Sequence, residues 1–256
     1  MYSFALSSRR FKAAGFHLLI SALVAAAAAV LVFGLWYPAP FGTLAGGTAL
    51  FSLLVAIDVV SGPALTAVVA SPGKPRGELV RDMTVIAAVQ CAALGYGIYT
   101  MAAARPVAVV FEIDLMRVVA AVDVDVTTLN QAPPTLQKLS WTGPWMMAAA
   151  RPTDAAEQLR TIELGLDQVH LAMLPRYWRE YGSLSDAAWA RARPVRQLLN
   201  RYPTSAAELA RIASEAHAPE HALRFLPLVS RQASWTAVLA PPHGRVVGHL
   251  PLDAFF

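Results

Sequence analysis

Long apolar runs dominate the first hundred residues of the chain, and a mixed pattern of apolar and polar positions follows them. Three runs, at about 13–36, 43–70 and 83–104, are each long enough for a helix to cross a hydrocarbon core of about 30 Å. Residues 105–256 look like an ordinary water-exposed domain and are numerous enough to bury a core of their own. The pattern predicts a membrane domain over 1–104, with three transmembrane helices, and a separate domain over 105–256.

The pattern within 105–256 predicts an α+β domain. Residues 105–125 are rich in valine and partly alternate, which favours one or two strands. Residues 234–240 and 246–252 flank the sequence PPHGR, so they predict two strands joined by a turn that contains Gly244. We expect these two regions to pair in one small antiparallel sheet.

Three helices are expected between the strand regions, over about 154–171, 184–200 and 205–217. Each begins near a residue that can cap a helix N-terminus and that has an acid three residues later. The pairs are Asp154 with Glu157, Ser183 with Asp186, and Ser205 with Glu208. The stretch 127–143 contains two consecutive prolines and is expected to be a loop.

Charged residues make up only 15% of the chain, against about 25% in soluble domains, and the net charge is +4. Basic residues border the apolar runs at their start and at the second connection: Arg9, Arg10 and Lys12, then Lys74, Arg76 and Arg81. The first connection, YPAPFG, has no charge. The positive-inside rule therefore predicts a cytoplasmic N-terminus, and a periplasmic domain 105–256 if the membrane is a bacterial inner membrane.

The first apolar run has an alternative interpretation as an export signal, because SSRRFK precedes it. However, the run is longer than the apolar part of a cleaved signal, and YPAPFG is a poor cleavage site. We therefore expect a retained membrane helix.

Asp58 lies near the middle of the second run and is followed by Gly62 and Pro63. An ionised carboxylate in the middle of a bilayer costs at least about 2.5–3.5 kcal/mol. Pro63 cannot donate a backbone hydrogen bond to the carbonyl one turn before it, and Gly62 allows a neighbouring helix to approach closely. Asp58 and Tyr96 lie at a similar depth of roughly 18–20 Å, so a hydrogen bond between them is one expectation.

Two interpretations of Asp58 stay open. Asp58 is either a polar residue that holds the helices of the bundle together, or a docking point for a membrane helix of another protein. A transport role is weaker, because three helices with one acid offer neither a relay nor an inverted repeat. We take Asp58, Gly62, Pro63 and Tyr96 as candidate partner-binding residues.

Other groups of reactive residues give weak signals. His217 and His221 have the spacing of zinc ligands on a helix, but Pro219 lies between them. Cys91 is the single cysteine, so a zinc site cannot be built from cysteines. No Walker loop, Rossmann fingerprint or nucleophile elbow is present, and no motif for reading nucleic acid. No catalytic, cofactor-binding or metal-ligating residue is assigned.

Four acids lie close together and suggest a catalytic pair: Glu112, Asp114, Asp123 and Asp125. On a strand Glu112 and Asp114 would share a face, as would Asp123 and Asp125. No nucleophile accompanies them in the sequence. A membrane enzyme that uses Asp58, or Glu112 with Asp114, therefore remains only a competing hypothesis.

Five segments resemble the TfpX/TfpZ family of type IV pilin accessory proteins, which also includes the fimbrial assembly protein FimB. They are RFKAAGFHLLISALVAAAAAVLVFGLWYPAPF, DVVSGPALT, VQCAALGYGIYT, ARPVAVVFEIDLMRVVAAVDVD and LPLVSRQASWTAVL. The resemblance covers nearly the whole chain, although residues 127–220 are much less distinctive. It implies an inner-membrane protein of a Gram-negative bacterium, with no enzymatic activity and no cofactor.

The resemblance also implies partners. The protein would support the stability, assembly or surface display of a cognate type IV major pilin, and the pilus assembly machinery is a further candidate partner. The membrane helices would contact the apolar helix of the pilin, and the periplasmic sheet would contact the pilin head. The alternative is a membrane-anchored periplasmic sensor or binding protein, also without enzymatic activity.

Overall fold

The computed structural model describes residues 2–70 and 74–256, with the side chains of residues 11–70 and 74–256. The chain forms two compact units. The membrane unit contains residues 1–36 and 47–104, and the sheet unit contains residues 37–46 and 105–256. The connection between the first two membrane helices therefore belongs to the unit that holds the sheet.

Three helical segments in the described residues are long and apolar enough to cross a membrane, as predicted: Phe11–Trp36, Gly47–Val69 and Arg76–Ala104. The first comprises most of α1 (Tyr2–Leu31) and a π-helical turn, η1 (Val32–Trp36). The second contains α3 (Gly47–Ala56), a π-helical turn η2 (Ile57–Ser61) and α4 (Gly62–Val69). The third is α5 (Arg76–Ala104).

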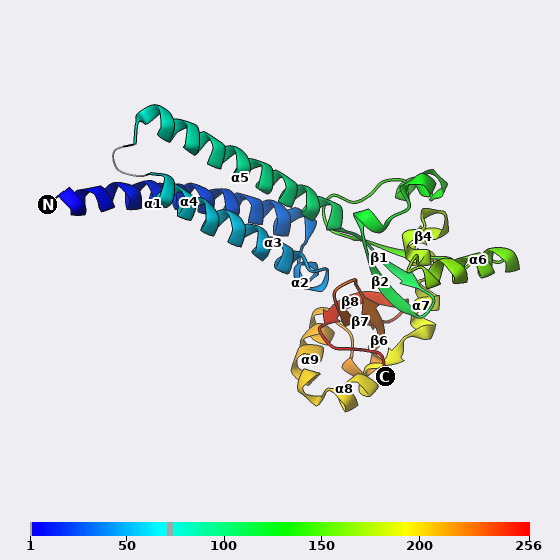
Figure 1. The fold of residues 1–256 in the computed structure, drawn as a ribbon. Coiled ribbons are helices and arrows are strands. Elements are labelled where there is room, and N and C mark those ends of the chain that lie inside the picture. The colour runs from blue at the N-terminus through cyan, green and yellow to red at the C-terminus, as the bar shows by residue number, and fades with distance from the viewer. Residues whose placement is uncertain (1, 71–73) are drawn as a thin grey trace. The chain divides into compact units, whose positions relative to one another are not determined.

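Two predicted boundaries of the membrane helices are wrong. The second helix begins at Gly47 instead of residue 43, because Phe41–Leu44 forms a separate short helix, α2. The third begins at Arg76, so Arg76 and Arg81, which were expected in the second connection, lie in its first turns. Within this unit α4 packs along α1, and α5 packs against α3 and α4 (Figure 1).

The sheet unit confirms the predicted α+β class. Its described residues form an eight-stranded sheet in the order β4-β3-β1-β2-β6-β7-β8, with β5 paired to β6. The strands are β1 (Pro106–Glu112), β2 (Leu115–Ala120), β3 (Trp145–Ala149), β4 (Trp178–Glu180), β5 (Arg193–Pro194), β6 (Arg224–Val229), β7 (Ser234–Ala240) and β8 (Arg245–Leu250).

The sheet is larger than predicted, and it is mixed instead of purely antiparallel. The β1–β3 and β2–β6 pairs are parallel, and the other pairs are antiparallel. The two predicted strand regions do not pair directly, because β6 lies between β2 and the β7–β8 hairpin. Gly244 lies in the β7–β8 turn with φ of 66°, a conformation that glycine adopts without strain.

The helices of the sheet unit are α6 (Ala155–Leu166), α7 (Ser185–Arg191), α8 (Val195–Arg201) and α9 (Ala206–Glu215). The helix predicted over 184–200 is therefore two helices, because β5 and its Pro194 interrupt it. The stretch 127–143 is mostly irregular, with short 3-10 turns at Val126–Gln131 and Pro134–Leu136.

Of the three predicted helix caps, only the first forms. The Asp154 carboxylate accepts a hydrogen bond from the backbone N–H of Glu157 at 2.9 Å. The hydroxyl groups of Ser183 and Ser205 instead donate backwards, to the carbonyls of Glu180 and Tyr202. A serine hydroxyl can satisfy a nearby carbonyl as well as an N–H, which is why the sequence pattern alone misplaced these caps.

The connection 37–46 contributes to the core of the sheet unit. Phe41 and Leu44 are buried in the same cluster as Val109 and Phe111 of β1, and the Ser230 hydroxyl donates a hydrogen bond to the Leu44 carbonyl at 2.6 Å. This apolar burial fixes the connection to the domain that follows the third membrane helix.

Candidate functional site: a polar groove among the membrane helices

Asp58 lies in η2, the π-helical turn that interrupts the second membrane helix. Gly62 and Pro63 follow at the start of α4. Pro63 has no N–H and so cannot close the normal helical hydrogen bond with the carbonyl four residues earlier. The wider π turn accommodates this loss, and such turns occur frequently at functional sites. The sequence prediction that the helix loosens beside Asp58 agrees with this geometry.

Gln90 on α5 contacts this turn. Its side-chain amide donates a hydrogen bond to the backbone carbonyl of Asp58 at 3.2 Å. A Cβ atom at position 62 would overlap the Gln90 amide, so the absence of a side chain at Gly62 makes room for it. Gly62 therefore allows close approach, as expected, and the group that approaches is a polar side chain of α5.

A cavity of about 160 Å³ opens between α1, η2 and α5, and we call it the polar groove. Asp58 lines it, together with His17, Ile20, Ser21, Ala87, Gln90, Cys91 and Leu94. The carboxyl atom Oδ1 of Asp58 is buried and has no hydrogen-bond partner among the described residues. His17 is held beside the groove by a hydrogen bond between its Nδ1 and the Thr66 hydroxyl, at 2.5 Å.

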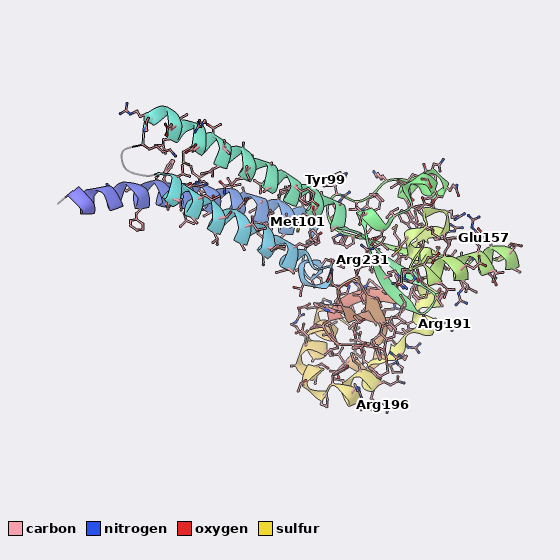
Figure 2. The ribbon with its side chains drawn as sticks, viewed as in Figure 1. Tyr99, Met101, Glu157, Arg191, Arg196 and Arg231 are labelled. Carbon is pink, nitrogen blue, oxygen red and sulfur yellow. The ribbon has the colours of Figure 1, made fainter. Side chains whose placement is uncertain are left out.

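The structure does not bring Tyr96 to Asp58. The Tyr96 side chain is 73% exposed, and the described residues contain no hydrogen bond between the two. Tyr96 instead lines a separate apolar cavity of about 240 Å³, together with Leu54 and Gly97 among other residues. Met101 also lines this cavity, and both Met101 and Tyr99 lie near the end of α5 (Figure 2).

The hydrogen bond expected between Tyr96 and Asp58 does not form because the depth of a residue in the membrane fixes only its position along the helix axis. It does not fix the direction in which the side chain points around that axis. Gln90 and Tyr96 are six residues apart, and at about 100° per residue they point to different faces of α5. Gln90 was missed, although a glutamine within an apolar run is a signal that the sequence carries.

The polar groove contains a carboxyl oxygen of Asp58 that has no hydrogen-bond partner among the described residues. A bilayer core offers no water, so an unsatisfied buried oxygen there lowers stability until a partner group reaches it. Ser21 and Gln90 add further hydrogen-bonding groups to the same surface. No cluster of three or more metal-ligating side chains occurs among the described residues.

Three of the four acids of the sheet unit that suggested catalysis take part in structural contacts. Buried Glu112 accepts a hydrogen bond from the Ala172 N–H at 2.7 Å and pairs with Arg117 at 3.4 Å. Asp114 lies in the exposed turn after β1 and not on a strand. Hydrogen bonds from Thr127 lower the pKa of the Asp125 carboxyl, which forms a local cap, and Asp123 pairs with Arg231 at 3.3 Å.

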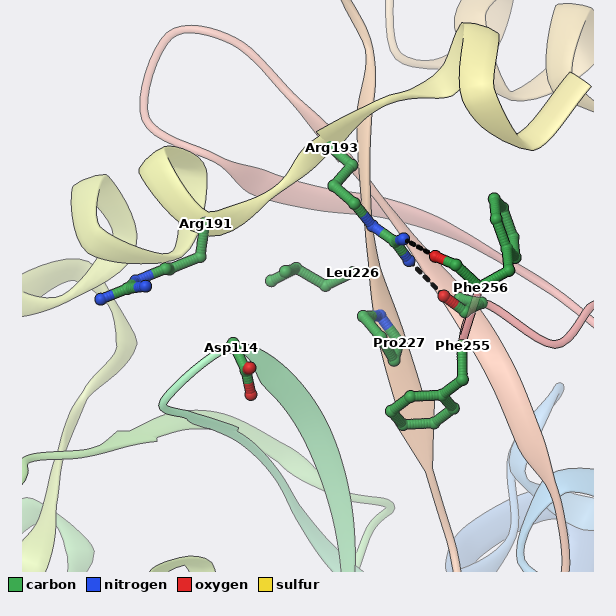
Figure 3. Close-up of a pocket in the computed structure, with 8 residues that line it drawn as sticks. Asp114, Arg191, Arg193, Leu226, Pro227, Phe255 and Phe256 are labelled. Carbon is green, nitrogen blue, oxygen red and sulfur yellow. Dashed lines mark hydrogen bonds between the residues drawn. The ribbon is translucent and has the colours of Figure 1, made fainter. Parts of the chain in front are cut away.

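A larger cavity of about 360 Å³ lies beside β6, where neither β2 nor β5 pairs with Leu226 and Pro227 (Figure 3). Arg193 crosses it, and its guanidinium donates hydrogen bonds to the carbonyls of Ala254 and Phe256. The same guanidinium lies 4.5 Å from the centre of the Phe225 ring. These contacts hold residues 254–256 against the sheet, which is a structural role.

Comparisons with known proteins support the FimB part of the resemblance that the sequence suggested. The family model "Fimbrial assembly protein FimB" matches residues 6–46, which include the first membrane helix and the connection after it. The fimbrial assembly proteins of serogroups I and E1 of Dichelobacter nodosus are 32% and 31% identical over 245 residues, each match covering 95% of both chains.

A third relative is the fimbrial assembly protein of serogroups C1 and C2 of the same organism. It is 42% identical over 121 residues, which are 47% of this chain and 92% of the relative. No solved structure matches. Because two relatives above 30% identity align over almost the whole chain, this protein belongs to the FimB family of fimbrial assembly proteins.

Proposed function

We propose that this protein is an inner-membrane accessory factor of the TfpX/TfpZ type, which holds its cognate type IV pilin before assembly or surface display. One observation carries the proposal: Asp58 has a buried, unsatisfied carboxyl oxygen in a groove among membrane helices. The relatives are named fimbrial assembly proteins, which agrees with a role in fimbrial assembly.

The groove suits a membrane helix as its occupant. Ile20, Ala87 and Leu94 give it apolar walls, while Asp58 and Gln90 supply polar groups. A pilin subunit waits in the membrane with one apolar helix, and a single polar group on that helix would satisfy Asp58. Interhelical hydrogen bonds in membranes average about 0.6 kcal/mol, so the contact is weak enough to be released.

The connection 37–46 supports a periplasmic location for the sheet unit. Because it packs in the core around Phe41 and Leu44, it lies on the same side of the membrane as residues 105–256. The basic residues lie around the start of the first membrane span and between the second span and the first turns of the third. They therefore belong to the opposite side, which the positive-inside rule assigns to the cytoplasm.

Two weak contacts on one tethered partner would act together. The polar groove would bind the pilin helix, and the periplasmic sheet unit would contact the pilin head. Linking two contacts raises the effective concentration of the second, so neither has to be strong. Two weak contacts without catalysis fit a chaperone, because a chaperone must release the pilin that it binds.

The test places a photoreactive residue at Ala87, which lines the groove, and leaves Asp58 intact. The matched control carries it at Val89, which is two residues along α5, is exposed and does not line the groove. In cells that make the cognate pilin, we expect an adduct with the pilin helix from position 87 and much less from position 89.

The Asp58→Ala variant completes the test. It should reduce both the position-87 adduct and the amount of surface pili by several fold, while the protein accumulates at its normal level. Asp58→Asn keeps an accepting oxygen and should retain part of both. Equal adducts from positions 87 and 89, or unchanged piliation in Asp58→Ala, would contradict the proposal.

A further inference from the structure

The loop 139–144 of the sheet unit packs on residues that directly follow two of the membrane spans. Arg105 comes after Ala104, the last residue of the third span, and its Nε donates a hydrogen bond to the Ser140 carbonyl at 3.2 Å. Pro38 lies two residues after the end of the first span. Gly143 approaches Pro38 so closely that a Cβ atom at position 143 would overlap the proline ring. The loop is therefore held where the chain leaves the membrane.

The length of α5 places Arg105 at the level of the lipid headgroups. The helix has 29 residues, so at about 1.5 Å per residue it is about 43 Å long. A bilayer measures about 40–45 Å when both headgroup layers are included, and about 30 Å of that thickness is hydrocarbon. A helix of this length that spans the bilayer therefore ends in a headgroup layer, and Arg105 is the next residue.

Trp141 is the exposed aromatic residue of this loop. The Arg105 guanidinium lies over its ring, 4.0 Å from the ring centre, yet the Trp141 side chain remains 60% exposed. This contact is internal to the sheet unit, and the chain itself ties Arg105 to the end of the third span. Trp141 is therefore within one side-chain length of a residue at the headgroup level.

Aromatic side chains at the ends of the spans support the same level for Trp141. Tyr99 lies five residues before the end of α5 and is 70% exposed (Figure 2). Trp36 and Tyr37, at the end of the first span, are buried instead. Tryptophan and tyrosine are enriched at both surfaces of a membrane, where their rings lie among the headgroups. Trp141 supplies an exposed tryptophan at a level where membrane proteins commonly place one.

We propose that the loop 139–144 binds the lipid headgroup layer of the membrane that the three helices span, with the ring of Trp141 inserted among the headgroups. The indole N–H donates a hydrogen bond to a lipid oxygen, while the apolar ring packs against the lipid. Lys138 is exposed three residues before Trp141, and its ammonium supplies a positive charge for a lipid phosphate. The contact would orient the sheet unit on the membrane surface.

The competing explanation is that Trp141 only stacks on Arg105 and faces water. The two explanations differ in what surrounds the residues next to Trp141, and a probe beside the tryptophan measures that difference. The proposal requires that the three helices span the membrane, but it does not require a pilin partner. Its outcome is therefore independent of the crosslinking test at position 87.

The test uses the full-length protein with Cys91→Ala, in vesicles of phosphatidylethanolamine and phosphatidylglycerol. A nitroxide spin label at Thr142→Cys, an exposed position, lies next to Trp141 and leaves the tryptophan in place. Power saturation compares the collisions of the label with oxygen, which concentrates in the bilayer, and with a water-soluble nickel chelate. We expect the ratio of oxygen to nickel collisions at position 142 to be several-fold higher than at a control position.

The matched control carries the label at Ile162→Cys, an exposed position on α6. Strand β1 has seven residues and extends about 23 Å from Arg105. Ile113, which directly follows β1, lines the same cavity as Ile162. The control therefore lies at the opposite end of β1 from the loop, and its label should collide mainly with the nickel chelate.

Two further variants test the ring itself. Trp141→Ala, added to the labelled Thr142→Cys, should lower the collision ratio at position 142 several fold, because the group that enters the headgroups is lost. Trp141→Tyr should preserve the ratio, since tyrosine also favours the interface. Equal ratios at positions 142 and 162 would overturn the proposal, and this comparison needs no change at Trp141. An unchanged ratio in a Trp141→Ala protein with a native near-UV circular dichroism spectrum would overturn it as well.

Discussion

Gln90 on α5 lies directly over Gly62 on the neighbouring helix and donates its side-chain amide hydrogen bond to the backbone carbonyl of Asp58. The carbonyl belongs to the π-helical turn η2. The contact therefore ties two membrane helices together at the point where one of them is irregular, and it leaves the Asp58 carboxyl oriented into the polar groove.

Replacing Gln90 by Leu should destabilise the membrane unit by about 0.6 kcal/mol, the average for an interhelical hydrogen bond in a membrane protein. Unfolding in mixed micelles with increasing SDS would measure the loss. Val89→Leu changes an exposed neighbour on α5 and should have no effect. A Gln90→Leu variant as stable as the Val89→Leu variant would show that the hydrogen bond contributes nothing to the bundle.

The connection 37–46 should stabilise the sheet unit although it lies between two membrane helices in the sequence. Leu44 is fully buried, so Leu44→Ala should lower the free energy of unfolding of this unit by about 2–5 kcal/mol. Thermal unfolding followed by near-UV circular dichroism would report it. Thr43→Ala, at an exposed position of the same connection, is the matched control and should change stability by less than about 0.5 kcal/mol.

Glu112 and Asp114 should respond differently to substitution, because only Glu112 is buried. Glu112→Ala leaves Arg117 without its ion pair and the Ala172 N–H without its acceptor, which should cost about 3–5 kcal/mol of stability. Glu112→Gln keeps an acceptor oxygen and should cost less. Asp114→Ala should leave unfolding unchanged. A stable Glu112→Ala protein that has lost its function would instead revive the catalytic interpretation.

The sequence predicts features that depend on neighbouring residues, such as the three apolar helices, the Asp154 cap and the turn at Gly244. It also indicates Asp58 and the interruption at Pro63, since both have local physical costs. The partner of Asp58 depends on how two helices are rotated against each other, which a depth count cannot give. For this reason Tyr96 was expected where Gln90 lies.

Long-range pairing limits the prediction of the sheet unit in the same way. The parallel contact of β2 with β6 joins residues more than a hundred positions apart. The Ser230 hydroxyl also reaches Leu44 across most of the chain. The break at Pro194 was different, because proline inside an expected helix is a local signal that the capping pattern outweighed.

His249 should make the sheet unit less stable in acid. Its ring lies 5.6 Å from that of Phe41, its Nε2 is buried without a partner among the described residues, and burial lowers its pKa below 6.5. The unfolded chain therefore binds the proton more readily than the folded chain. The stability that the neutral ring provides is complete above about pH 6.5 and is lost as the pH falls below it.

The melting temperature of the sheet unit should consequently fall between pH 7 and pH 5, with at most about 1.4 kcal/mol lost per pH unit for each such histidine. His249→Phe should reduce this dependence without abolishing it, because burial and Arg117 also lower the pKa of His170. If His249→Phe gives the same pH profile as the native chain, protonation of His249 does not oppose folding.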